Sequence, residues 1–406
     1  MQKAIQQKIR VETVSLGTYV KVVGGFAFKS EFFSSEGTPL VRISDIKNDS
    51  IFLTEAARIP TEKIGRGQDY RVEPGDILIA MSGATTGKIG VVPDDCVQPV
   101  LQNQRVGNFK VIEPNKVDKK YLKHYLVSSS YQYQIWQTMA GVAQPNISSR
   151  QLEQIEIPLP PIAQQKRIAA ILDKAEEIRG LRRRALGELD AIVQSIFLEM
   201  FGDPVTNPKE WKLMRFQDLL SVPLRNGLSP SNSGTVTGKV LTLSAITGNR
   251  FRESAIKTST FQASPPSHQT VDDTDFLICR GNGNIHLVGK AYFPTYSMFD
   301  VVFPDTMIAA QIKSDYIERE FLQHIWNSNM VRSQIESFAR TTNGTFKVNQ
   351  TMLESILISV PPLLIQQEFA RRVEAIKHLK TAHCDSLTHL DALFASLQHR
   401  AFRGEL

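Results

Sequence analysis

The second half of the chain repeats the first at a constant offset of 201 residues. Over residues 141–201 and 342–402 the match needs no gap, and it pairs Leu152 with Leu353 and Pro160-Pro161 with Pro361-Pro362. The upstream parts repeat more loosely, with VRISDI (41–46) matching LTLSAI (241–246) and GDILIAMSG (75–83) matching TDFLICRGN (274–282). A repeat of this kind reproduces one structural unit, so the chain is expected to contain two copies of a single plan.

Each copy is predicted to consist of a variable, strand-rich domain followed by a long helix. The segments are a first variable domain (1–159), a central helix (160–201), a second variable domain (202–360) and a C-terminal helix (361–406). Pro161 and Pro362 stand where a first-turn proline is tolerated, because its missing N–H would have no partner there. The expected fold class is therefore α+β, with two tandem mixed, mostly β domains joined by two long helices.

Apolar residues recur in both helical segments with alternating spacings of three and four, which is typical of a coiled-coil seam. Arg182 and His383 occupy one matched seam position, either fixing the register or marking a local splay. The two seams are expected to pack against each other as an antiparallel coiled coil about 60 Å long, at ~1.5 Å per residue. The predicted helix–helix seam consists of Ile168, Ile171, Ala175, Ile178, Leu189, Ile192, Phe369, Ile376, Leu379, Leu390, Leu393 and Leu397.

Composition places the chain among ordinary globular proteins. Of its 406 residues, 42% are apolar and 22% are charged, and the net charge of +6 permits a nucleic-acid partner without requiring one. No apolar run approaches the ~18 residues of a membrane span, and the start MQKAIQQKIR has no apolar core of a secretory signal. Three widely spaced cysteines argue against a disulfide framework or a zinc site. We expect a cytoplasmic protein.

The stretch GDILIAMSGATTGKIG (75–90) looks like a nucleotide-binding P-loop but fails its requirements. Only three residues separate Gly83 from Gly87, and Ile89 follows Lys88 where a metal-binding hydroxyl is needed. The sequence also lacks the tetrapeptide of adenine methyltransferases, a nuclease carboxylate cluster and the common hydrolase motifs. We therefore expect no catalytic residues, no metal site and no cofactor in this chain.

The chain resembles the specificity subunit of type I restriction–modification systems over nearly its whole length. The resemblance is carried by GFAFKSEFF, PLVRISDI, GDILIAMSGATTGKIGVV, NISSRQLEQIEIPLPPIAQQKRIAAILD and ISVPPLLIQQEFARRV, and above all by the Pro-Pro and Gln-Gln pairs that open each repeated helix. It implies two target-recognition domains, each reading one half of a split, asymmetric site on double-stranded DNA. It also implies helices that set the half-site spacing and dock two methyltransferase subunits, with motor-nuclease subunits joining. S-adenosylmethionine and ATP would then belong to those partners.

The second domain departs from the family pattern, because RGNGNIHLVGK stands in place of SGATTGKIGVV. This difference suggests an unlike base preference. Side chains suited to base edges and phosphates occur in comparable loops of both domains. The candidate DNA-binding residues are Lys29, Ser82, Thr85, Lys88, Gln102, Gln104, Arg105, Gln144 and Asn146 in the first domain, and Arg225, Asn226, Arg250, Arg280, Asn282, Asn284, His286, Asn343 and Lys347 in the second.

Two other functions stay open at this point. One is a DNA-specificity subunit that serves a different phage-defence complex, with the same fold and another partner. The other is a coiled-coil scaffold that assembles proteins without reading DNA, although loops rich in Asn, Gln and Arg do not favour it. At an offset of 201 the pairs Gly87-Lys88 and Gly289-Lys290 do not align, so their relation also stays open.

Overall fold

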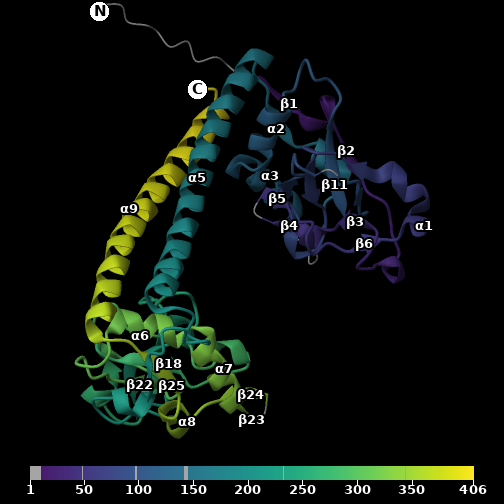
Figure 1. Ribbon diagram of the computed structural model, residues 1–406. Coiled ribbons are helices and arrows are strands. Elements are labelled where there is room, and N and C mark those ends of the chain that lie inside the picture. The colour runs from purple at the N-terminus through teal and green to yellow at the C-terminus, as the bar shows by residue number, and fades with distance from the viewer. Residues whose placement is uncertain (1–10, 48, 97, 141–144, 232, 343) are drawn as a thin grey trace, which may run out of the picture. The chain divides into compact units, whose positions relative to one another are not determined.

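The chain forms two compact units, each of which combines a strand-rich domain with halves of both long helices. The computed structural model describes residues 11–47, 49–96, 98–140, 145–231, 233–342 and 344–406 (Figure 1). Unit 1 runs to Arg183 and also takes Asp385–Leu406, and unit 2 is Arg184–Cys384. The described part of the chain contains no helix long and apolar enough to cross a membrane. The predicted boundaries kept each helix whole, whereas the units divide both helices near their middles.

The domain of unit 1 (domain 1, residues 13–158) is built on two sheets. One has the order β2 (Val20–Gly24), β11 (Val106–Val111), β8 (Ile77–Ala80), β9 (Ile89–Val91), β5 (Asp49–Ile51), β4 (Ile46–Lys47). The other has the order β6 (Arg58–Ile59), β3 (Thr38–Val41), β10 (Val100–Gln102), β7 (Arg71–Val72), and β1 (Thr13–Ser15) pairs with β12 (Glu156–Pro158). The helices are α1 (Thr61–Ile64), α2 (Lys119–Leu126), α3 (Ser129–Met139) and α4 (Ser149–Glu153).

The domain of unit 2 (domain 2, residues 212–360) repeats this plan with one added sheet and without counterparts of β5 and β4 in its first sheet. One sheet has the order β14 (Arg225–Asn226), β22 (Met307–Ala310), β18 (Phe276–Cys279), β20 (Ala291–Tyr292). The other has the order β16 (Ile256–Phe261), β15 (Val236–Leu241), β21 (Met298–Val302), β17 (Thr270–Val271). Added to them is a small sheet of β19 (Gly281–Asn282), β24 (Thr345–Lys347) and β23 (Arg340–Thr342), while β13 (Lys212–Arg215) pairs with β25 (Leu357–Val360). The helices are α6 (Arg319–Trp326), α7 (Asn329–Phe338) and α8 (Gln350–Glu354).

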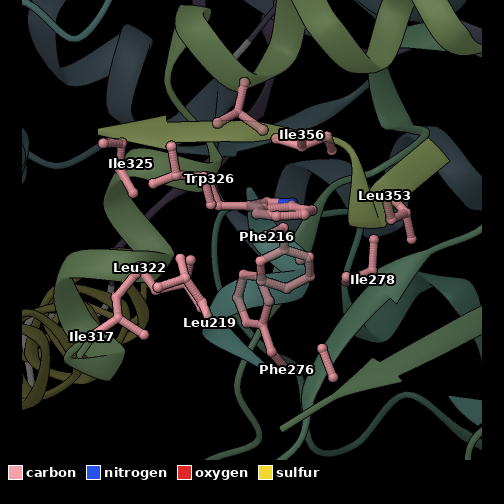
Figure 2. Packing of buried hydrophobic residues seen from close by; sticks show 14 of the residues in the cluster. Phe216, Leu219, Phe276, Ile278, Ile317, Leu322, Ile325, Trp326, Leu353 and Ile356 are labelled. Carbon is pink, nitrogen blue, oxygen red and sulfur yellow. The ribbon is translucent and has the colours of Figure 1, made fainter. Parts of the chain in front are cut away.

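Trp326, the last residue of α6, lies at the centre of the largest core cluster of domain 2. Its side chain is fully buried, and its ring lies 4.5 Å from the ring of Phe216 and 5.5 Å from that of Phe276, centroid to centroid. Figure 2 shows these rings packed against Ile278 and Leu353. The core therefore joins a helix to the sheet that carries the 280–290 loop.

The long helices α5 (Ile162–Phe201) and α9 (Leu363–Ala401) pack antiparallel within each unit (Figure 1). In unit 1 the Arg179 guanidinium contacts the Asp391 carboxylate at 2.5 Å. In unit 2 Lys380 pairs in the same way with Asp190. The offset of 201 converts Arg179 into Lys380 and Asp190 into Asp391, so the duplication reproduces one ion pair in both units. The antiparallel coiled coil expected from the repeat is thus present within each unit.

Only one of the two stripes predicted for each seam faces inward. Ile168, Ala175, Leu189, Phe369, Ile376, Leu390 and Leu397 are buried or partly buried, as predicted. Ile171 is also partly buried. Four residues of the other predicted stripe lie outside, since Ile178, Ile192, Leu379 and Leu393 are 38–52% exposed. The residues that follow them by one position take the inner places: Arg179, Val193, Lys380 and Phe394.

The reason for the error is that charged side chains occupy part of the inner stripe. Arg179 lies inside because its guanidinium sits 4.3 Å from the centre of the Phe394 ring and also pairs with Asp391. A pattern based on hydrophobicity chose the neighbouring Ile178 instead.

One glutamine in each helix locks that helix to its own domain. The Gln165 amide accepts from the Asp118 N–H and donates to the carbonyls of Lys116 and Pro160. Gln366, at the equivalent position, accepts from the Glu318 N–H and donates to the carbonyls of Tyr316 and Pro361. Both side chains are fully buried. These bonds explain why a glutamine follows each Pro-Pro pair.

Replacing Gln366 by leucine should therefore destabilise unit 2. The substitution keeps the approximate volume but leaves the Glu318 N–H and two carbonyls without their partner, at about 1–3 kcal/mol for an unsatisfied buried group. The matched control is Gln367→Leu, because Gln367 is the next residue and is exposed. Chemical denaturation should give a lower free energy of unfolding for Gln366→Leu alone, and equal values for both variants would contradict this role.

The contacts between each domain and its helix carry opposite charges in the two units. In unit 1 Lys123 of α2 pairs with Glu176 of α5. In unit 2 Glu320 of α6 pairs with Lys377 of α9. His124 and His324 lie within these contacts, and burial lowers the pKa of both imidazoles. The contact therefore lies at the same place in both units, but the positive residue belongs to the domain in unit 1 and to the long helix in unit 2.

Candidate nucleic-acid interface

A shallow hollow in domain 1 is formed where strand β8 ends. Three backbone hydrogen bonds build it: Met81 N–H to Arg105 O (2.9 Å), Ile147 N–H to Met81 O (2.9 Å) and Val106 N–H to Asn103 O (2.9 Å). The last bond closes the turn between β10 and β11. The residues that line the hollow are Met81, Ser82, Gln104, Arg105, Asn146, Ile147 and Ser148. Because the backbone groups are satisfied internally, the side chains of Gln104, Arg105 and Asn146 are left exposed.

Domain 2 repeats this backbone scaffold bond for bond. Arg280 N–H donates to Thr306 O (2.8 Å), Val348 N–H to Arg280 O (2.9 Å) and Met307 N–H to Pro304 O (2.8 Å). These bonds equate Arg280 with Met81, Thr306 with Arg105 and Val348 with Ile147. The positions of Asp305 and Lys347 then correspond to those of Gln104 and Asn146. The scaffold is shared, and the side chains that it presents are different.

The two Gly-Lys pairs are structurally equivalent, which answers the question left open by the sequence. Gly87 N–H donates to Ala80 O (2.8 Å) and Gly289 N–H to Cys279 O (2.7 Å). Both glycines have positive φ, +87° and +73°, and an added Cβ would come within 2.7 and 2.6 Å of Ile135 and Ile335 respectively. Only glycine suits such a position. The pairs fail to align at the offset of 201 because the second loop is longer between strand end and glycine.

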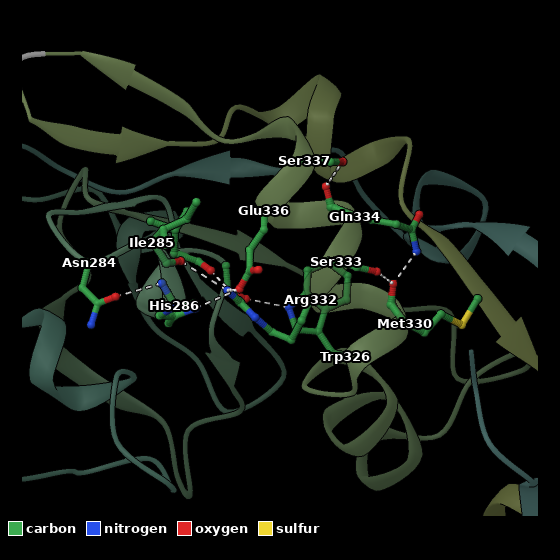
Figure 3. Close-up of polar contacts among 12 residues, drawn as sticks. Asn284, Ile285, His286, Trp326, Met330, Arg332, Ser333, Gln334, Glu336 and Ser337 are labelled. Carbon is green, nitrogen blue, oxygen red and sulfur yellow. Dashed lines mark hydrogen bonds and ion pairs between the residues drawn. The ribbon is translucent and has the colours of Figure 1, made fainter. Parts of the chain in front are cut away.

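The longer loop of domain 2 is held by helix α7, as Figure 3 shows. Arg332 donates to the carbonyls of Val288 (2.5 Å) and Ile285 (3.3 Å). Glu336 joins Arg332 (3.2 Å) to His286 (3.1 Å), and hydrogen bonds from His286 and Arg332 lower the pKa of the Glu336 carboxyl. In domain 1 the shorter loop is held to helix α3 by a hydrogen bond from the Gln132 amide to Gly87 O (3.2 Å). The roles of Arg332 and Glu336 were not predicted from the sequence.

The structure brings many of the predicted DNA-binding residues together. Ser82, Gln104, Arg105 and Asn146 line the hollow of domain 1, and Thr85 and the exposed Lys88 lie on the adjoining loop. In domain 2 Arg280 and Lys347 hold the equivalent positions, and Asn282, Asn284 and His286 lie on the loop. Lys29 and Arg250 are exposed in other loops, and Asn226 is exposed at the end of β14. Gln144 and Asn343 fall outside the described residues.

Two predicted residues have side chains engaged by the fold, and we leave them out of the proposed interface. Gln102 is only 2% exposed, and its amide donates to the carbonyls of Val23 and Val106. Arg225 pairs with the buried Asp275 carboxylate and donates to the carbonyl of His268. Residue type alone suggested a base contact in both cases, whereas burial engages the Gln102 side chain and the ion pair with Asp275 engages that of Arg225.

The candidate residues selected from the sequence did not include Asp305, which follows Pro304 in a turn. The turn is present, as the Met307 N–H to Pro304 O bond shows. Its equivalent in domain 1 is the turn that carries Gln104 and Arg105. Aligning this turn with its partner in the other repeat is the signal that would have found Asp305.

His124, Asp173 and Glu176 form the group of possible metal ligands in the described part of the chain. Lysines already neutralise its carboxylates, since Lys120 lies 2.9 Å from Asp173 and Lys123 lies 2.5 Å from Glu176. Burial raises the pKa of Asp173, but the hydrogen bonds from Lys120 and His124 outweigh it and lower the pKa overall. We assign this cluster to the contact between domain 1 and its helix.

The fold defines a duplicated protein in which one backbone scaffold presents unlike side chains in its two domains. A family model for the type I restriction modification DNA specificity domain matches residues 8–188. The chain is similar to the specificity subunits of type I restriction–modification systems.

Similar proteins of this family match nearly the whole chain. The type I restriction enzyme EcoKI specificity subunit of Escherichia coli (strain K12) is 26% identical, over 96% of this chain and 88% of its own length. The StySPI specificity subunit of Salmonella potsdam is 25% identical, over 97% and 89%. A solved S subunit from M. genitalium has the same fold, with a TM-score of 0.54 at 13% identity and 99% coverage of both chains.

Proposed function

We propose that this chain is the DNA-reading subunit of a type I restriction–modification complex, in which each domain reads one half of a bipartite, asymmetric site. The observation that carries the proposal is the backbone scaffold shared by the two domains, which presents unlike side chains in each. Domain 1 presents Gln104, Arg105 and Asn146, whereas domain 2 presents Arg280 and Lys347. Amide groups pair well with adenine edges and guanidinium groups with guanine edges. Two different sets of side chains therefore support two different half-sites.

The Gly-Lys loops support contacts with the DNA backbone. Lys88 is exposed next to the Gly87 turn, and Thr85 lies in the preceding turn η5 (Gly83–Thr85). Hydroxyl groups, lysines and backbone N–H groups are the usual partners of phosphate oxygens. Contacts of this kind position a protein on the duplex without reading its sequence. We assign Thr85 and Lys88 to that role.

The helix pair is proposed to set the spacing between the half-sites. Helix α5 has 40 residues and is therefore about 60 Å long at ~1.5 Å per residue. One turn of B-DNA measures about 34–36 Å, so readers held by such helices can reach half-sites about a turn apart. A spacer of unread base pairs would then separate the two halves.

The outer face of the helix pair is proposed to dock two copies of one partner. Unit 1 exposes Ile178 and Leu393, and unit 2 exposes Ile192 and Leu379. At the offset of 201, Ile178 corresponds to Leu379 and Ile192 corresponds to Leu393. Each unit therefore exposes the same pair of apolar positions. Two equal surfaces on one chain fit two equal subunits, and the family assigns these to the methyltransferase. Methyl transfer, cleavage and their cofactors, S-adenosylmethionine and ATP, would belong to methyltransferase and motor-nuclease partners acting in the cytoplasm.

Replacing both Ile178 and Leu379 by glutamate should weaken partner docking without unfolding the chain. Both side chains are exposed, at 38% and 52%, so the substitutions cost little stability. A charge in the centre of an apolar interface has to be desolvated, which should weaken docking by at least tenfold. The matched control is Lys174→Glu with His378→Glu on exposed positions of the same helices. Titration with the methyltransferase should separate the two variants, and equal affinities would rule out this docking face.

Substituting Arg105 tests the proposed reading function. In the complex reconstituted with its methyltransferase, Arg105→Ala should relax one half-site at about 1–3 kcal/mol per lost base contact and leave the other half unchanged. Arg167→Ala, an exposed residue of α5, is the control and should leave both halves unchanged. Sequencing of the modified adenines reports the outcome. A scaffold would yield no consensus at all, and an Arg105→Ala complex with both halves intact would remove this residue from the reading site.

A further inference from the structure

One turn of domain 2 carries a carboxylate where the equivalent turn of domain 1 carries an amide. Asp305 and Gln104 occupy the same position in equivalent turns, closed by Met307 N–H to Pro304 O (2.8 Å) and Val106 N–H to Asn103 O (2.9 Å). The residues before them also make equivalent parallel bridges, Pro304 with Leu228 and Asn103 with Phe26. The correspondence thus rests on backbone pairing on both sides of the turn.

Arg280 lies beside Asp305 and is oriented by the same turn. Its backbone N–H donates to Thr306 O (2.8 Å), and its Nη1 donates to the backbone carbonyl of Asp305 at 3.3 Å. Arg280 and Asp305 are both partly exposed. Among the described residues the Asp305 carboxylate has no hydrogen-bond or ion-pair partner. The site therefore offers free acceptors and free donors side by side.

A carboxylate on a surface that contacts DNA restricts which DNA groups can bind there, because it cannot bind the phosphate backbone. Phosphates would repel it, and it carries acceptor atoms only. Among the base edges of the major groove, cytosine presents the N4 amino donor alone, whereas adenine presents its amino donor beside an N7 acceptor and so calls for an amide. Guanine presents two acceptors, O6 and N7, which match an arginine fork. Asp305 and Arg280 together fit the two edges of one C·G pair.

We propose that Asp305 and Arg280 form a reader for a single C·G base pair in the half-site of domain 2. Asp305 accepts from the cytosine N4 amino group, and Arg280 donates to the guanine O6 and N7 of the same pair. The inference rests on the proposed DNA-reading function and adds the identity of one base pair to it. In domain 1 the equivalent positions are Gln104 and Met81, so that half-site is read differently at this place.

The test is the methylation consensus of the complex formed by the full chain and its methyltransferase. The wild-type complex should require C·G at one position of the domain 2 half-site. Asp305→Ala should relax that position by roughly 5- to 150-fold in relative methylation rate, the range of one base contact. The domain 1 half-site should not change. Asp300→Ala, an exposed aspartate of the same domain, is the control and should leave every position unchanged.

A reciprocal variant guards against a change that merely disturbs domain 2. Gln104→Asp places the carboxylate in the equivalent turn of domain 1 and should introduce a cytosine preference at one position of the other half-site. The inference is overturned if the domain 2 half-site contains no C·G requirement, if Asp305→Ala leaves that requirement intact, or if Gln104→Asp leaves its half-site unchanged. A wild-type complex without any consensus would instead refute the proposed function itself.

Discussion

Replacing Trp326 by alanine is expected to lower the free energy of unfolding of domain 2 by about 3–5 kcal/mol, the usual cost of removing a buried large aromatic side chain. The side chain is fully buried between Phe216 and Phe276 (Figure 2). Its indole Nε1–H also donates to the Gly289 carbonyl at 2.8 Å, and that carbonyl belongs to the 280–290 loop. The substitution therefore creates a cavity and leaves a buried acceptor unpaired.

The matched control is Trp136→Ala, because Trp136 of α3 is 63% exposed and its loss should change stability by no more than about 0.5 kcal/mol. Hydrogen exchange can follow the amides of β18 and α6 separately from those of domain 1. Faster exchange confined to unit 2 in Trp326→Ala is the expected result. Equal protection in both variants would mean that Trp326 is not the centre of this core.

Removing one heptad from each long helix should shorten the spacer between the half-sites. Deleting residues 180–186 and 381–387 keeps the seven-residue repeat and spares the ion pairs Arg179–Asp391 and Lys380–Asp190. Each helix becomes about 10 Å shorter, which corresponds to about three base pairs of B-DNA. The consensus of the shortened complex should keep both half-sites and lose about that number of spacer positions.

The control for this experiment is a deletion that breaks the repeat. Removing two residues from each helix rotates the part beyond the deletion by about 200° about the helix axis. The inner stripe then turns away from its partner, which should destabilise the helix pair without yielding a new defined spacer. A heptad deletion that keeps the wild-type spacer would show that the helices do not set the spacing.

The sequence predicted the architecture well because the duplication is itself a structural constraint. Ile168 and Phe369 start the two inner stripes as the periodicity requires. The second stripe could not be located from hydrophobicity, because two of its inner positions hold the charged residues Arg179 and Lys380. Both form ion pairs with the other helix, and Arg179 also contacts the ring of Phe394. Specific long-range contacts of this kind leave no periodic signal in the chain.

The candidate site was predictable in its loops and less so in its residues. Arg105 and Asn146 were selected by type and lie in the hollow, whereas the equally suitable Gln102 is buried. Which polar side chain faces outward depends on strand register, and a single sequence fixes register only through its tertiary contacts. Asp305 was overlooked because its significance lies in the comparison of two turns that share little sequence.

The most direct test of the central claim is the set of adenines methylated by the wild-type complex on random duplex DNA. The account predicts one bipartite, asymmetric consensus, made of two unlike half-sites separated by a spacer of fixed length without base preference. Two identical half-sites, a continuous recognition sequence or methylation without any consensus would contradict it.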